Sequence, residues 1–84
     1  MNLLGFLILS ILNDKDANAR LRGMTLKDVA EAENLGCIDN TIYKQLQQFI
    51  SSGYVACGVK DGHANTYYIT ESGKEYLRKE RMQK

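Results

Sequence analysis

Apolar residues occur along the chain in blocks whose spacing changes from helical to strand-like and back again. Residues 2–12 are apolar at nearly every position, which predicts a helix that must be covered on more than one side. Residues 13–23 are mostly polar and predict a loop, with a short extended piece near residues 21–24. The remaining chain predicts two further helices, two strands and a last helix.

Capping residues mark where the second and third helices begin and end. Thr25 predicts the N-cap of the second helix, with Asp28 three residues later as a near capping box. Gly36 is suited to a left-handed position after that helix. Asp39 then predicts the N-cap of the third helix and Gly53 its C-cap. Two helices joined by a connection this short are typical of a helix-turn-helix.

The third helix has one apolar and one polar face. Its apolar positions fall within about 120° of one another and are Ile38, Ile42, Leu46, Phe49 and Ile50. The opposite face carries amide and ammonium groups that could reach base edges in the major groove of DNA, namely Asn40, Lys44 and Gln47. Thr41 and Tyr43 flank this face and could reach phosphates. The face therefore predicts a recognition helix at residues 39–52.

After the third helix, the spacing of the apolar residues becomes typical of β-strands. Residues 54–59 and 66–69 are rich in β-branched and aromatic side chains, and the pair Asp61-Gly62 between them is a strong hairpin signal. Thr70 predicts the N-cap of a last helix at residues 71–83.

Together these elements predict a fold that is mainly α with a small β-hairpin. The order is helix, short strand, helix, helix, two strands, helix, which is that of a winged helix-turn-helix. A chain of 84 residues is expected to form one domain, residues 1–84. In it, residues 25–53 would form the helix-turn-helix, residues 54–70 the wing and residues 71–83 the C-terminal helix.

The net charge and the reactive side chains limit the functions that the chain is expected to have. The net charge is only +1, whereas phosphate binding normally leaves a basic footprint. The two cysteines, Cys37 and Cys57, form no CxxC pair and His63 is the single histidine, which argues against a zinc site. No nucleophile is placed beside a base in the sequence, so we expect neither an enzyme nor a bound cofactor or metal. Free thiols and an apolar segment too short to cross a bilayer fit a cytoplasmic protein.

Four runs of sequence resemble the winged-helix domains of PadR-like and MarR-like bacterial regulators. They are Thr25 to Ala30, Thr41 to Leu46, Ser52 to Val55, and Tyr67 to Gly73 with its characteristic YYIT-ESG. The resemblance implies a prokaryotic or phage transcription regulator that binds double-stranded DNA. It places Tyr43 and Lys44 among the recognition-helix contacts, and it places Lys60, His63 and Asn65 in the wing, which touches backbone or minor groove in such proteins.

A homodimer is expected because the first helix is too apolar to be covered from one side and the domain is small. The dimer interface would use apolar residues of the first and last helices, which are Leu3, Leu4, Leu7, Ile8, Tyr76 and Leu77. The alternative is a winged helix that binds another protein and no DNA. In that case the polar face of the third helix would be merely solvated.

Overall fold

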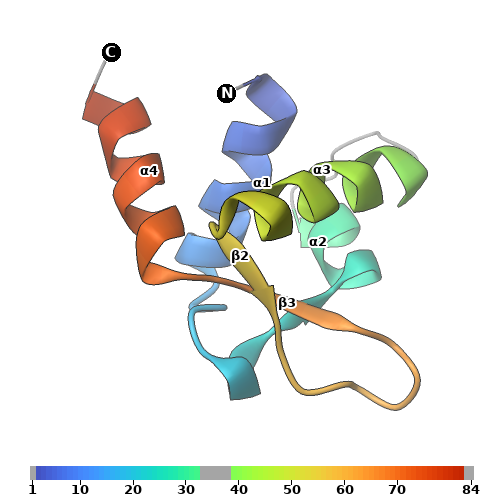
Figure 1. Ribbon diagram of the computed structural model, residues 1–84. Helices are drawn as coiled ribbons and strands as arrows, with labels where there is room; N and C mark the ends of the chain where they lie inside the picture. Colours follow the sequence, from blue (N-terminus) through green and yellow to red (C-terminus); the bar gives the residue numbers. More distant parts are fainter. Residues whose placement is uncertain (1, 33–38, 83–84) are drawn as a thin grey trace.

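The computed structural model describes residues 2–32 and 39–82, and its elements follow the predicted order (Figure 1). The helices are α1 (Leu3–Asp14), α2 (Leu26–Ala32), α3 (Asp39–Ser52) and α4 (Glu71–Met82). The strands are β1 (Met24–Thr25), β2 (Val55–Cys57) and β3 (Thr66–Ile69), and a 3-10 turn, η1, spans Arg20–Arg22. The predicted mainly helical winged helix-turn-helix is confirmed.

Helix α1 lies at the centre of the fold. It packs against α2, α3, α4 and β3, and Ile8, Leu9 and Leu12 are completely buried. The expectation that such an apolar helix must be covered on several sides is met by the chain itself. Full burial of an aliphatic side chain contributes about 1.5–3 kcal/mol, so these three residues are major contributors to the stability of the single subunit.

Two residues assigned to a dimer interface from the sequence belong instead to this core. Ile8 is 0% exposed and Leu77 is 1% exposed in the single chain, so neither can contact a second subunit; that part of the prediction is wrong. Periodicity alone could not separate burial by the same chain from burial by a partner. At the N-terminal end of α1, Leu3 is exposed while Leu4 and Leu7 are half-buried.

The predicted helix caps are present wherever the chain is described. The Thr25 hydroxyl accepts a hydrogen bond from the Asp28 amide, and the Asp28 carboxylate accepts one from the Thr25 amide. Thr70 caps α4 by accepting from the Gly73 amide, and its own hydroxyl donates to the Gly53 carbonyl. Gly53 has a φ of +83°, as its predicted C-cap position requires. The predicted roles of Gly36 and of the Asp39 side chain lie outside the described part.

The sheet has three antiparallel strands in the order β1-β3-β2, so β3 is central. The segment expected to be extended at residues 21–24 is instead the 3-10 turn η1 followed by β1, which pairs Met24 with Tyr67. On the other side Cys57 is opposite Tyr67. Because Tyr67 is flanked by a strand on each side and is 2% exposed, it anchors the sheet to the rest of the domain.

The start of α4 lies very close to the chain before β2. A Cβ atom at Gly73 would overlap the Tyr54 carbonyl oxygen. In an open helix, Gly→Ala stabilises by about 1 kcal/mol. Here we expect Gly73→Ala to lower the free energy of unfolding by about 1–3 kcal/mol, because backbone atoms must move apart.

Urea denaturation of Gly73→Ala and of the neighbouring, exposed Ser72→Ala measures this contact. Ser72→Ala should stay within about 0.5 kcal/mol of the parent protein. A Gly73→Ala protein more stable than the parent would show that the close approach of α4 is not maintained.

Candidate nucleic-acid interface

The polar face of α3 points away from the core. Ile42 and Leu46 on the inner face are both completely buried, which fixes the rotation of the helix. On the outer face Asn40, Thr41 and Lys44 are exposed. A further outer-face residue, Tyr43, is 44% exposed, and Gln47 is half-buried at the edge. All the predicted recognition residues therefore have at least part of their surface in solvent.

The wing is a tight hairpin that projects away from the helices (Figure 1). Asp61 and Ala64 exchange two backbone hydrogen bonds, of 2.9 and 3.0 Å, and Gly62 between them has a φ of +62°. This confirms the hairpin signal in the sequence. The predicted contact residues Lys60, His63 and Asn65 are exposed on this hairpin.

A surface hollow of about 580 Å³ separates α3 from the wing. Its lining joins the start of α2 to both elements and consists of Thr25, Leu26, Lys27, Asp28, Tyr43, Asp61, Ala64, Asn65 and Tyr67. The hollow brings together two predicted contact residues, Tyr43 and Asn65, and does not include Lys60 or His63. Lys27 is a residue that the sequence analysis missed; its position in the first turn of the second helix was the available signal.

The hollow also carries negative charge. Asp28 and Asp61 both line it, and like charge repels phosphates. Asp28 is held in place by its capping interaction with Thr25. Lys27 is the one cation among the described residues that line the hollow, whereas Lys44 and Lys60 lie outside it.

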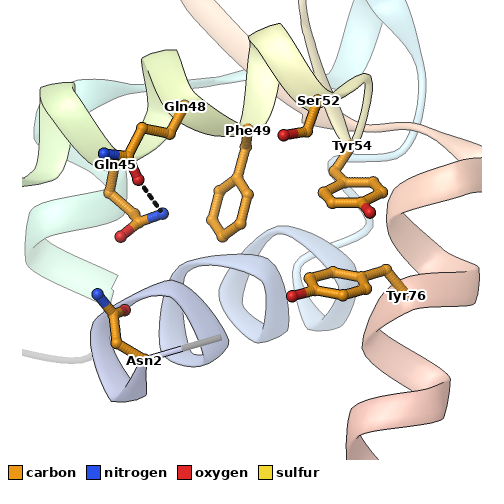
Figure 2. Close-up of a pocket in the computed structure, with 7 residues that line it drawn as sticks. All are labelled: Asn2, Gln45, Gln48, Phe49, Ser52, Tyr54 and Tyr76. Carbon is orange, nitrogen blue, oxygen red and sulfur yellow. Dashed lines mark hydrogen bonds between the residues drawn. The ribbon is translucent and has the colours of Figure 1, made fainter.

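The reverse face of α3 packs on aromatic residues, as Figure 2 shows. The rings of Tyr54 and Tyr76 stack with centroids 4.3 Å apart and an angle of 9° between planes. Phe49 lies against Tyr54 at 6.3 Å. Beside them, a hollow of about 220 Å³ is also lined by Gln45 and Gln48, which hydrogen bond to each other at 3.5 Å. This packing supports α3 from behind, on the side away from its recognition residues.

Three of the four cations of α4 are paired with acids, and Lys79 takes part in none of the ion pairs among the described side chains. Lys74 lies 3.8 Å from the Glu71 carboxylate, and Arg78 pairs with Glu75. Arg81 reaches the Asp14 carboxylate at the end of α1, at 3.5 Å. Exposed pairs of this kind contribute little to stability, but they neutralise the local field. Most of the positive charge of the helix is therefore neutralised.

Within residues 2–32 and 39–82, no three His, Cys, Asp or Glu side chains are grouped so that they could hold a metal ion. Over the same residues, no helix is long and apolar enough to cross a membrane.

Burial raises the pKa of the Tyr67 hydroxyl above its ordinary value of 10.0, and the nearby Cys57 and Tyr43 add to the increase, while a hydrogen bond with Asn65 opposes it. The neutral form is therefore favoured in the folded protein. Below pH 10, the ordinary pKa of tyrosine, the neutral Tyr67 hydroxyl makes its full contribution to stability. This contribution is lost as the pH rises through the higher pKa of the folded state. We expect Tyr67→Phe to flatten this part of the pH dependence of the unfolding free energy.

Urea denaturation between pH 9 and pH 12 measures the effect, with Tyr68→Phe as the matched control. Tyr68→Phe should keep the alkaline slope of the parent protein. Equal slopes for all three proteins would contradict the assignment to Tyr67.

Comparisons with known proteins identify the fold. No protein-family model and no curated protein matches the sequence. A PadR family transcription regulator from Clostridium difficile R20291 has a TM-score of 0.79 at 17% identity, over 98% of this chain and 86% of that one. The DNA-binding TubR fragment from Clostridium botulinum has a TM-score of 0.73 at 26% identity, over 94% of this chain and 95% of that one.

A third similar structure is MepR of S. aureus in complex with DNA. It has a TM-score of 0.78 at 18% identity, over 98% of this chain and 63% of that one. These likenesses confirm the fold that the resemblance in the sequence implied, which is the winged helix-turn-helix fold of PadR-like and MarR-like regulators.

Proposed function

We propose that the protein is a cytoplasmic prokaryotic or phage transcription regulator that binds duplex DNA sequence-specifically as a homodimer. In this proposal α3 enters the major groove and the wing, residues 54–70, contacts the adjacent backbone or minor groove. The observation that carries the proposal is the exposed polar face of α3 beside an exposed hairpin. An α-helix with amides and an ammonium group facing outward is what base readout requires.

The side chains on this face are available for binding. Asn40 and Lys44 are exposed one helical turn apart. Among the side chains that the structure describes, Lys44 belongs to none of the ion pairs. Amide groups suit adenine and a lysine suits guanine. Asn40, Lys44 and Gln47 are therefore proposed as base contacts, and Thr41 and Tyr43 as phosphate contacts.

The similar structures support DNA as the partner, since one is a DNA-binding fragment and another was solved with DNA. They do not favour the alternative of a protein-binding module. That alternative would also leave the polar face of α3 without a role, because docking surfaces on proteins are depleted in charged residues at their centre. No catalytic role is proposed, since the similar structures reported above are regulators.

We propose a homodimer because one subunit offers few cations to the DNA backbone. Asp28 and Asp61 oppose phosphate binding close to the recognition face, so we infer that two half-sites are needed for useful affinity. The proposed interface uses the residues that remain accessible near the N-terminus of α1 and on α4. Leu3 is 71% exposed, and Leu4, Leu7 and Tyr76 are half-buried.

The recognition face can be tested with two double substitutions on different sides of α3. Lys44→Ala with Gln47→Ala should weaken binding to the preferred duplex by about 1–3 kcal/mol for each base contact that is lost. Gln45→Ala with Ser52→Ala changes two residues that line the hollow beside Phe49 and Tyr54, about 120–140° round the helix from Asn40, and should leave affinity unchanged. Fluorescence polarisation with duplexes selected from a random pool measures both.

Two results would contradict different parts of the proposal. If the parent protein does not bind duplex DNA even at low salt, DNA binding itself is wrong. If the parent binds and both double variants bind equally well, the assignment of the recognition face is wrong.

The dimer is tested by changing one exposed leucine. Leu3→Ser should shift the protein toward monomer in sedimentation velocity, because it removes apolar surface from the proposed interface. Leu21→Ser changes a leucine that is 85% exposed on η1 and should have no effect on assembly. A parent protein that remains monomeric at high micromolar concentration would exclude the dimer.

A further inference from the structure

The 3-10 turn η1 presents two cations and an apolar side chain to solvent. Arg20 and Arg22 are exposed, and Leu21 between them is 85% exposed. The turn lies before β1, outside the helix-turn-helix and the hairpin, and nothing in the proposed recognition face uses it. In Figure 1 it occupies the lower end of the molecule, at the base of the sheet from which the wing projects.

Backbone contacts join η1 directly to the base of the wing. The Val59 amide donates to the Arg20 carbonyl at 3.0 Å. The Thr66 hydroxyl donates to the Val59 carbonyl at 2.7 Å. A Cβ atom at Gly58 would come within 2.5 Å of the Arg20 carbonyl oxygen, so only glycine allows the two segments to approach so closely. The turn and the hairpin base are therefore held together through the main chain.

The cations along this joined edge are not neutralised. Within the described part of the chain, Arg20, Arg22 and Lys60 take part in none of the ion pairs, in contrast to the paired cations of α4. The acid nearest to them in the hairpin sequence is Asp61, which is itself exposed. Val59, beside Lys60, is also exposed, at 47%. The edge thus combines free positive charge with a small apolar surface.

We propose that η1 is a second DNA-backbone contact, in which Arg20 and Arg22 bind phosphates next to those contacted by the wing. The proposal rests on the proposed function. In a 3-10 turn with three residues per turn, positions i and i+2 point about 120° apart, so the two guanidinium groups reach different phosphates.

This contact would offset the sparse charge of the wing. Lys60 is the single Lys or Arg in residues 54–70, which by itself supplies little backbone affinity. With Arg20 and Arg22 the wing side of the domain carries three cations. Backbone contacts position a protein without reading sequence, so η1 contributes to affinity and orientation and not to specificity.

The salt dependence of DNA binding tests the proposal with a matched control. Arg20→Gln with Arg22→Gln and Lys74→Gln with Arg78→Gln remove the same charge, from η1 and from the paired positions of α4. Each phosphate contact contributes about 0.9 to the slope of log K against log salt. The η1 variant should therefore lose about 1.8 from the slope per bound chain. The loss of affinity between 50 and 200 mM salt should then be about twelvefold smaller than in the parent.

The α4 variant should keep the slope of the parent protein. Thermal unfolding followed by circular dichroism confirms that both variants fold, as expected for exposed side chains. Hydroxyl-radical footprinting adds a positional readout: the η1 variant should lose protection at the outer edge of the site, where the wing lies, and retain it at the centre.

Two results separate this proposal from the proposed function. If the parent binds DNA with a salt-dependent affinity and the η1 variant keeps the same slope and footprint, the η1 contact is wrong while DNA binding stands. If both variants lose the same slope, the effect is one of net charge and the η1 contact is again overturned. An absence of binding by the parent would contradict the proposed function itself.

Discussion

The burial of α1 is the constraint on which the rest of the structure depends. A helix that is apolar on nearly all sides is stable in water only when other elements surround it, and here α2, α3, α4 and β3 do so. Each of these elements must therefore direct its own apolar face toward α1. The rotation of α3 follows from this, because burial of Ile42 and Leu46 leaves the opposite face of the helix in solvent.

The fold also places paired and unpaired cations on different surfaces of the domain. A net charge of +1 describes the whole chain but not its surfaces. Three of the four cations of α4 are paired within the helix or with Asp14, whereas those of η1, α3 and the wing remain unpaired among the described side chains. A nearly neutral protein can thus present one edge that attracts phosphates. The acids Asp28 and Asp61 limit that attraction near α3.

Local signals in the sequence predicted most of the fold. The reciprocal cap of Thr25 and Asp28, the Thr70 cap and the Asp61-Gly62 turn depend on neighbouring residues, so they can be recognised without the tertiary structure. The exposed positions of α3 followed from helical periodicity in the same way. Their contacts with DNA remain a prediction.

What the sequence did not predict depends on contacts between distant segments. Ile8 and Leu77 have the pattern of an interface, but their burial is decided by how α1 and α4 pack in one chain. The position of η1 depends on Gly58, whose missing Cβ admits the Arg20 carbonyl from 38 positions earlier in the chain. A glycine in a hairpin indicates flexibility or a turn, and nothing in its local sequence reveals which segment approaches it.

The central claim is that one edge of the domain, formed by the outer face of α3, the wing and η1, binds DNA. Backbone amide NMR spectra recorded during titration with duplex DNA at low salt test it most directly. The largest shifts are expected at residues 40–47, at residues 58–65 and at η1, while α4 should change little. Shifts concentrated on α1 and α4, or no shifts at all, would contradict it.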